Sequence, residues 1–401
     1  MCDFRAPMSV DARRSPAIDA LRGIAVLAVL LDHLPFSGSL TPATVAGSAA
    51  VPVFPSWLSD ALSVGQYGVN LFLVLSGFCI HMRWARRGDL MERVDFLPFW
   101  KRRLHRLYPP YLVALLASIA GLFVLHGVLG HAGPSLHQQL GYASSSQLAV
   151  DVLLLLILSQ NLNGASHRIG NPPFWTLALE EQLYLLYFPL LGMRRRWGWR
   201  VTLGVIAAVT LGLRAAAPMM PASFGVFWFL VGPTRWLEWA LGALAVEAHV
   251  GIVKLPRWCF SGILAALALV GATALRMLPG VLHLPRLPAL EDPAFGFAFF
   301  LLTNAACAAR WGERASGIVA RPLVRVGLFS YSIYLVHMPI LTAVKQVGIR
   351  LGLGVAAITI LRLAVPIALA YVFFLVVERR FLNRPGRAAP GLAAEKPAKA
   401  A

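Results

Sequence analysis

The chain has 401 residues, of which 58% are hydrophobic and only 13% are charged, and its mean hydropathy is +0.68. These values exclude an ordinary soluble globular protein and are typical of a protein that crosses a membrane several times. The formal net charge of +18 would suggest a nucleic-acid partner in a soluble protein. Because the basic residues fall between apolar runs, the positive-inside rule explains this charge, and we expect no nucleic-acid partner.

Apolar segments follow one another along the whole chain. There are eleven, at residues 18–35, 65–82, 104–125, 148–160, 174–192, 201–217, 224–247, 259–277, 293–309, 326–344 and 355–377. A helix that spans a membrane needs about 20 apolar residues. The first segment follows Arg13 and Arg14 without a clear cleavage site, so we interpret it as a signal anchor.

The charge of the loops predicts the topology. The loop at 83–106 carries eight Lys and Arg residues, and the loop at 194–200 reads RRRWGWR, so both should be cytoplasmic. The loops at 36–64 and 126–147 contain no Lys or Arg and should lie outside. Segment 148–160 then cannot cross the membrane, and we interpret it as a re-entrant or interfacial helix.

The sequence therefore predicts an all-α polytopic membrane protein with about ten transmembrane helices and both termini in the cytoplasm. We expect an N-terminal tail at 1–17, a transmembrane domain at 18–378 and a disordered C-terminal tail at 379–401. The four cysteines, Cys2, Cys79, Cys259 and Cys307, have no metal-site spacing, so we expect neither a metal nor a disulfide framework.

The first apolar segment, DALRGIAVLAVLLDH, carries ionisable groups at both ends. An ionisable side chain in the hydrocarbon region costs roughly ~3 kcal/mol, so such residues usually have a function. Arg22 and His33 are eleven residues apart, which in a helix is about 16 Å and close to three full turns. The spacing predicts that both side chains lie on one face of the helix. The predicted topology places Arg22 near the cytoplasm and His33 near the outer surface.

Two carboxylates follow in the segment at 174–192. Glu180 and Glu181 lie about two turns from its outer end, at nearly the depth expected for His33. A histidine and a carboxylate at one depth can form a general-base pair, or simply an ion pair that joins two helices. Arg235 and Glu238 are three residues apart, which predicts an ion pair on one helix face.

The run KRRLHRLYPPYL places several cations at the entrance of the third segment, namely Lys101, Arg102, Arg103 and Arg106. One interpretation is topological anchoring. The other is an anion site, because clustered guanidinium groups near a helix N-terminus suit phosphates.

Five stretches together resemble the motifs of one family. They are the pair Arg22 and His33 followed by LFLVLSGFCI, KRRLHRLYPPYL, FWTLALEEQLYLLYFP and SYSIYLVHMPI. In the same order, from residue 18 to about 380, they are similar to motifs of the bacterial membrane acyltransferase-3 family. One departure is Thr176, where the family usually has serine.

The resemblance implies an O-acyltransferase of the bacterial cytoplasmic (inner) membrane. Such enzymes move an acyl group, usually acetyl from acetyl-CoA, onto a hydroxyl of a sugar, a glycan or a natural product such as a macrolide. It implies that Arg22 and His33 are required for activity, and it adds polar-site candidates: Ser76, Arg102, Arg103, Trp175, Glu180, Glu181, Tyr331 and His337. Some members carry a fused hydrolase-like domain; without one, we expect direct acylation or a separate partner protein.

These expectations combine into one mechanism. The phosphates of the donor bind Arg22 with Arg102, Arg103 or Arg106, and His33, oriented by Glu180, removes the proton of the acceptor hydroxyl. Trp175 and Tyr331 are candidate donors to the oxyanion. The acceptor would be selected by the outer loops at 36–64, 126–147 and 278–292.

Two alternatives stay open. The first is a two-step route through an acyl-His33 or acyl-Cys79 intermediate. The second is a secondary transporter or exporter of a lipid-linked glycan, which would also have many helices and buried charges. Transporters commonly contain paired repeats, and the sequence has no obvious repeat relating its two halves.

Overall fold

The computed structural model describes residues 15–36, 56–86, 94–129, 145–163, 171–220, 227–283, 285–311 and 320–382, and these contain helices and no strand. The predicted outer loops at 36–64 and 126–147 and both predicted tails lie largely outside the described residues. In chain order the elements are α1 (Pro16–Phe36), α2 (Ser56–Ser63), η1 (Val64–Tyr67), α3 (Gly68–Ala85), α4 (Phe96–Leu129), α6 (Ser145–Leu156), η3 (Gln160–Leu162), η4 (Pro172–Phe174), α7 (Trp175–Ala216), η5 (Ala217–Met219), η6 (Phe227–Leu230), η7 (Gly232–Arg235), α9 (Trp236–His249), η8 (Arg257–Phe260), α10 (Gly262–Val281), α11 (Pro288–Ala308), α12 (Ala320–Leu328), α13 (Ser330–Arg350), α14 (Val355–Val376) and η9 (Glu378–Arg380).

The prediction of an all-α membrane protein is confirmed, because every predicted apolar segment contains helix. Within the described part of the chain, five helical stretches are long and apolar enough to cross a membrane: Leu58–Ala85, Pro172–Met219, Gly262–Val281, Ser330–Arg350 and Val355–Arg380. The predicted number of about ten spans and the cytoplasmic placement of both termini stay predictions.

Two breaks in the helical path differ from the predicted segments. The segments predicted at 174–192 and 201–217 both lie in α7, and the chain turns between them at Gly198, whose φ of 69° is accessible to glycine without strain. The segment predicted at 326–344 is instead divided into α12 and α13 at Phe329. The break at Phe329 falls within a stretch that hydropathy alone treats as continuous, whereas Gly198 falls between two separately predicted segments.

The segment predicted not to cross the membrane forms a short helix. The 12 residues of α6 extend only about 18 Å, against a hydrocarbon core of about 30 Å. The chain then reverses at Leu158, which has a φ of 52°, and buries Gln160 and Asn161. Their side-chain amides donate to the carbonyl oxygens of Phe174 (2.6 Å) and Leu230 (2.7 Å). As a result α7 begins among buried residues rather than at a surface.

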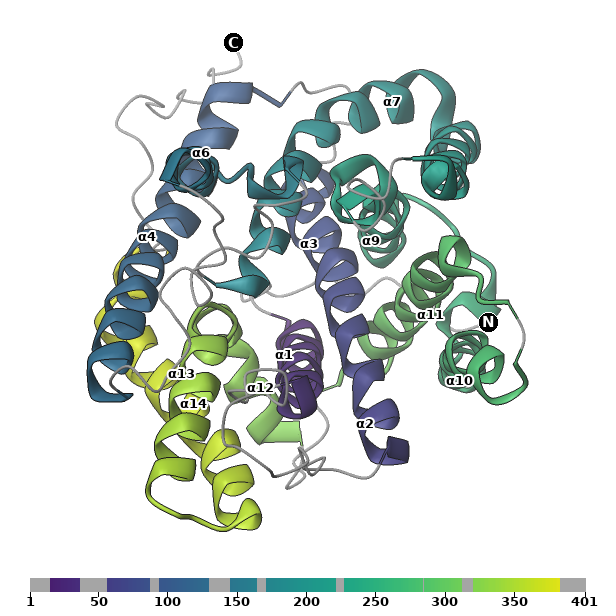
Figure 1. The fold of residues 1–401 in the computed structure, drawn as a ribbon. Helices are drawn as coiled ribbons and strands as arrows, with labels where there is room; N and C mark the ends of the chain where they lie inside the picture. Colours follow the sequence, from purple (N-terminus) through teal and green to yellow (C-terminus); the bar gives the residue numbers. More distant parts are fainter. Residues whose placement is uncertain are drawn as a thin grey trace.

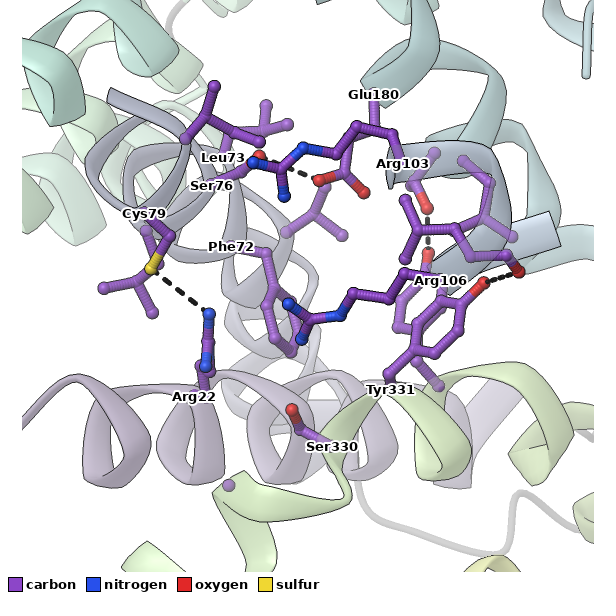
Figure 2. A pocket seen from close by; sticks show the side chains of 18 of the residues that line it. Arg22, Phe72, Leu73, Ser76, Cys79, Arg103, Arg106, Glu180, Ser330 and Tyr331 are labelled. Atoms are coloured by element: carbon purple, nitrogen blue, oxygen red, sulfur yellow. Dashed lines mark hydrogen bonds between the residues drawn. The ribbon is translucent and has the colours of Figure 1, made fainter. Parts of the chain in front are cut away.

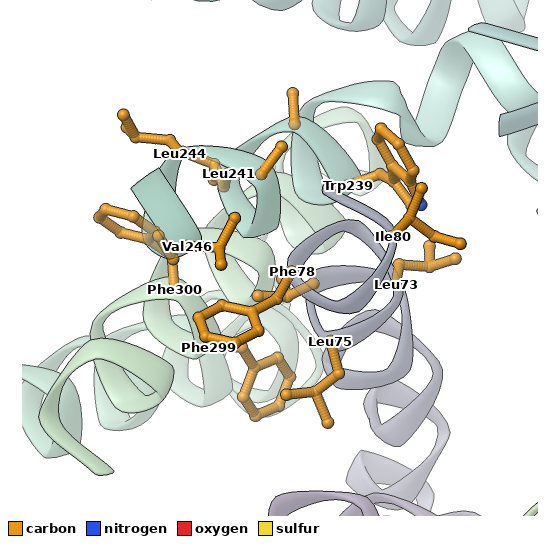
Figure 3. Packing of buried hydrophobic residues seen from close by; sticks show 14 of the residues in the cluster. Leu73, Leu75, Phe78, Ile80, Trp239, Leu241, Leu244, Val246, Phe299 and Phe300 are labelled. Atoms are coloured by element: carbon orange, nitrogen blue, oxygen red, sulfur yellow. The ribbon is translucent and has the colours of Figure 1, made fainter. Parts of the chain in front are cut away.

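The centre of the protein is built from α1, α3, α9 and α11, with α13 and α14 on one side of α1 and α10 on the other side of α11 (Figure 1). Phe78, Trp239 and Phe299 belong to the apolar cluster between α3, α9 and α11 (Figure 3). The backbones of α3 and α9 touch, since a Cβ on Gly77 would overlap the carbonyl of Trp239. Small residues at such crossings are typical of helices that pack in membranes.

Candidate active site

A cavity of about 170 Å³ lies where α1, α3, α4, α7 and the start of α13 converge (Figure 2). Its charged and hydroxyl-bearing lining comes from segments far apart in the sequence and comprises Arg22, Ser76, Arg103, Arg106, Thr176, Glu180, Tyr184, Ser330, Tyr331, Tyr334 and Glu378. Three guanidinium groups and two carboxylates therefore share one cavity. At full ionisation this leaves an excess of positive charge.

Arg22 enters the cavity from the first turns of α1. Its Nη1 donates to Asp19 Oδ1 at 3.2 Å, one helical turn earlier, and its Nη2 donates to Cys79 Sγ on α3 at 3.2 Å. The i, i+3 spacing brings Asp19 beside it on the same helix face. These two contacts hold the guanidinium at the wall of the cavity, as Figure 2 shows for Cys79.

Two further arginines come from α4. The helix begins at Phe96, so the basic run predicted as an entrance lies inside its early turns, and Arg103 and Arg106, three residues apart, share one face. The guanidinium of Arg103 lies over the rings of Phe99 (5.5 Å) and Tyr184 (5.9 Å), and its Nε has no hydrogen-bond partner among the described residues.

Arg102 does not line the cavity, although it was expected at the same site as Arg103. Neighbouring residues on a helix project about 100° apart, so Arg102 points in a different direction from Arg103. Of the four arginines expected to bind the donor, the structure brings Arg22, Arg103 and Arg106 to the cavity but not Arg102, and donor binding stays a prediction.

Glu180 is held in the cavity by hydrogen bonds from two helices. Its Oε1 accepts from Ser76 Oγ of α3 at 2.8 Å and from Tyr184 Oη, one turn later on α7, at 2.5 Å. Ser76 is fixed in turn by Trp239 Nε1, which donates to it at 3.3 Å. Ser76 therefore connects the buried carboxylate to the packed core.

Two other candidates on α7 do not line the cavity. Glu181 is buried on another face of the helix, and its Oε2 has no hydrogen-bond partner. Trp175 packs against the main apolar core. Neither residue is therefore positioned to contact a molecule in this cavity.

The opposite wall comes from the end of the chain. Glu378 accepts hydrogen bonds from the backbone N–H of Ser332 (3.1 Å) and from its hydroxyl, and Tyr331 donates to the carbonyl of Leu107 at 2.8 Å. Sequence reasoning expected Tyr331 but missed Glu378. A signal was present, since Glu378 follows directly on the apolar run of α14.

His33 does not line this cavity and does not contact Glu180. Its Nδ1 lies 2.7 Å from the carbonyl oxygen of Val29, and its ring packs edge-on against that of His337 with centroids 5.1 Å apart. The expectation that Glu180 orients His33 was wrong. Because α7 begins among buried residues, Glu180 in its second turn lies beside Ser76 rather than beside His33.

The two histidines have the same hydrogen-bonding arrangement. Nδ1 of His337 lies 3.1 Å and 2.9 Å from the carbonyl oxygens of Ile333 and Tyr334. A carbonyl can only accept, so each neutral ring carries its proton on Nδ1 and presents Nε2 as a free acceptor. Nε2 of His337 is buried without a partner. The expected polar candidate His337 thus lies beside His33 rather than in the cavity.

Tyr334 connects the cavity to the histidine pair. It lines the cavity, and its ring packs against Phe72 (6.0 Å between centroids) and against His337 (5.7 Å). Its hydroxyl lies 2.5 Å from Thr176 Oγ1 and donates to Pro173 O at 2.9 Å. Tyr334 therefore contacts both the cavity and His337.

Sequence reasoning also missed a buried polar cluster between α3, α7 and α9. Glu247 accepts from Arg194, through Nη2 at 2.8 Å, and from Trp199 Nε1 at 2.7 Å, while its Oε1 lies 2.9 Å from His81 Nε2. The cluster fixes the basic turn at Gly198 against α3. The predicted ion pair of Arg235 and Glu238 is present, at 3.3 Å.

The comparison with known families decides what kind of protein carries this site. A family model described as an acyltransferase domain, acyltransferase-3, matches residues 15–377. The chain belongs to the acyltransferase-3 family. This membership and its apolar helices make it a multi-pass membrane acyltransferase.

The chain is similar in sequence to three named acyltransferases. The chain is 29% identical, over 96% of both sequences, to acyltransferase MdmB of Streptomyces mycarofaciens. It is 25% identical over 86% of its length to O-acetyltransferase OatA of Staphylococcus aureus, and 28% identical over 51% of its length to peptidoglycan O-acetyltransferase OatA of Listeria monocytogenes. It spans 53% and 28% of the lengths of these two OatA proteins. No solved structure matches the chain.

Proposed function

We propose that this acyltransferase transfers an acyl group, acetyl in the simplest case, from acyl-CoA to a hydroxyl of a sugar, glycan or glycosylated natural product. The observation that carries the proposal is the convergence of Arg22, Arg103 and Arg106 on one cavity. Guanidinium groups recognise phosphate oxygens through directed, charge-assisted hydrogen bonds. The nucleotide end of coenzyme A carries several phosphate groups and matches this excess of positive charge.

The proposed orientation of the donor follows from α1. Arg22 and His33 are about 16 Å apart along this helix, and the stretch at 83–106 that leads into and includes the first turns of α4 carries eight Lys and Arg residues. We place the phosphates at the arginines, on the cytoplasmic side, and the pantetheine arm past Phe72 and Tyr334 toward His33. Both rings border the path and provide the apolar contacts that an extended alkyl amide arm needs.

His33 is the proposed general base. Its Nε2 takes the proton of the acceptor hydroxyl while the oxygen attacks the thioester carbonyl, and a C–O bond forms. When the tetrahedral intermediate collapses, the C–S bond breaks and the leaving thiolate takes the proton back from the imidazolium. The contact between Nδ1 and Val29 O supports this role, because it fixes the tautomer that leaves Nε2 free.

Glu180 has a different proposed role from the one its sequence position suggested. It lies among the arginines and is held by Ser76 and Tyr184, so it orders the donor pocket and balances part of its charge. A pocket with cations alone would bind any anion, whereas fixed carboxylates restrict where phosphates fit. We therefore treat Glu180 as a positioning residue for the donor.

The membrane placement is part of the proposal. We propose about ten spanning helices with α6 re-entrant, both termini cytoplasmic and the acceptor presented at the outer end of α1, in the bacterial cytoplasmic membrane. Two of the relatives are named O-acetyltransferases, one of them of peptidoglycan, which supports a sugar hydroxyl as the acceptor.

The test is acceptor-dependent release of CoA thiol by the purified protein in detergent. We expect release from acetyl-CoA in the presence of a suitable glycan or macrolide, and a loss of about 100-fold or more in His33→Ala. Equal rates in His33→Ala and wild type would contradict the assigned base. Absence of CoA binding and of turnover with every acceptor in the panel would contradict the proposed donor.

A further inference from the structure

Two buried cations lie on α13 and α14, and one of them, Arg362, contacts His33. Lys345 on α13 is 7% exposed and Arg362 on α14 is 1% exposed. Neither residue takes part in the arginine-lined cavity or in the proposed acyl-transfer step.

The packing of α13 against α14 brings the two side chains together. A Cβ on Gly348 would contact Ile358, so the antiparallel pair places Lys345, one turn earlier, opposite Arg362, one turn later. Nη2 of Arg362 donates to the backbone carbonyl of His33 at 3.1 Å. The cations therefore adjoin the end of α1 that carries the imidazole.

No carboxylate balances this pair in the described part of the chain. Neither cation forms an ion pair there, and Lys345 Nζ and Arg362 Nε have no hydrogen-bond partner. The acid nearest in sequence to His33 is Asp32, whose Oδ2 lies 3.9 Å from His33 Nδ1 and whose Cβ packs on Gly65 of η1. Burying cations without a counter-charge is strongly unfavourable unless something else binds them.

Purely structural roles account for only part of this arrangement. Arg362 caps a carbonyl in the last turn of α1, which is favourable at a helix C-terminus but uses one N–H of its guanidinium. Lys345 lies near the end of α13, where a lysine normally extends its ammonium group to water. Its burial excludes that explanation.

We infer that Lys345 and Arg362 bind an anionic oxygen group, a phosphoryl or a carboxylate, of the acceptor molecule. Anchoring this group would bring a neighbouring hydroxyl to Nε2 of His33, with the acyl donor arriving from the opposite side. This inference rests on the proposed function and narrows it, because it predicts that the acceptor is an anionic glycan or glycoconjugate rather than a neutral one.

The experiment measures anion binding without acyl transfer. The purified protein in neutral detergent is saturated with CoA to occupy the donor pocket, and its unfolding temperature is followed during titration with inorganic phosphate or acetate, against sodium chloride at equal ionic strength. We expect one or both oxyanions to raise the unfolding temperature of the wild type.

The matched variants are Lys345→Met, Lys345→Arg and, as a control at an exposed lysine, Lys254→Met. We expect the half-saturating oxyanion concentration to rise about tenfold or more in Lys345→Met, since one charge-assisted hydrogen bond is lost, and to stay near the wild-type value in the other two. If Lys345→Arg responds as the wild type does, the effect of Lys345→Met comes from the lost charge and not from misfolding.

The inference is overturned if neither oxyanion acts on the wild type, or if Lys345→Met responds as Lys254→Met does. Nanodiscs distinguish an acceptor from a lipid headgroup. An oxyanion response that persists in discs containing phosphatidylglycerol supports an acceptor site, whereas a response found only in phosphatidylcholine discs means that anionic lipid occupies the site and overturns the inference. Failure of thiol release would instead refute the proposed function and leave this binding result intact.

Discussion

Replacing Arg103 by methionine removes a guanidinium from the donor cavity while retaining an unbranched apolar side chain over Phe99 and Tyr184. Because the Nε of Arg103 has no hydrogen-bond partner among the residues that the structure describes, we expect the loss to fall on the donor rather than on the fold. One charge-assisted hydrogen bond contributes about 1.5–3 kcal/mol, which corresponds to about 10- to 150-fold weaker binding.

The assay is the initial rate of thiol release against acetyl-CoA concentration, with the oligomeric state and the unfolding temperature as checks on folding. We expect KM to rise in Arg103→Met with a smaller change in kcat, because phosphates far from the thioester interact similarly in the ground state and the transition state. The adjacent Arg102→Met is the matched control and should change KM by less than about threefold, because Arg102 does not line the cavity. Equal effects at the two positions would refute the assignment of the donor pocket.

Three other substitutions test the packing and the polar contacts. Glu247→Gln should lower the free energy of unfolding by about 2 kcal/mol, measured by thermal unfolding in detergent, because it removes the counter-charge of the partly buried Arg194; an unchanged transition would show that the ion pair contributes nothing. Gly77→Ala should sharply reduce the yield of folded protein, since its Cβ would overlap a carbonyl of α9, whereas Gly271→Ala has free space and should be neutral or slightly stabilising. Ser76→Ala should raise the KM for acetyl-CoA several-fold by releasing Glu180, and an unaltered KM would contradict the positioning role.

Hydropathy and loop charge predicted the helices well, because apolar length and basic loops are local properties of the sequence. The placement of Arg22 and His33 on one helix also follows from local spacing, and both residues lie in α1. The arrangement of Glu180 could not be predicted this way. Its depth depends on where α7 begins, and that is set by the reversal at Leu158 and the buried amides that follow it.

The choice between Arg102 and Arg103 shows a second limit. Four basic residues at a helix entrance are equivalent until the start and the neighbours of that helix are known, because adjacent side chains project in different directions. The cluster around Glu247 shows a third, since His81 and Glu247 are 166 residues apart and meet only when α3 packs on α9. An acid near the end of an apolar run was the available signal for both Glu247 and Glu378.

The most direct test of the account is thiol release from acetyl-CoA by wild type, Arg22→Met and His33→Ala, measured across a panel of neutral and anionic glycans and macrolides. The account predicts acceptor-dependent release by the wild type, a raised KM for acetyl-CoA in Arg22→Met and a greatly reduced kcat in His33→Ala. Wild-type rates in His33→Ala, or acetyl-CoA affinity that does not change in Arg22→Met, would contradict it.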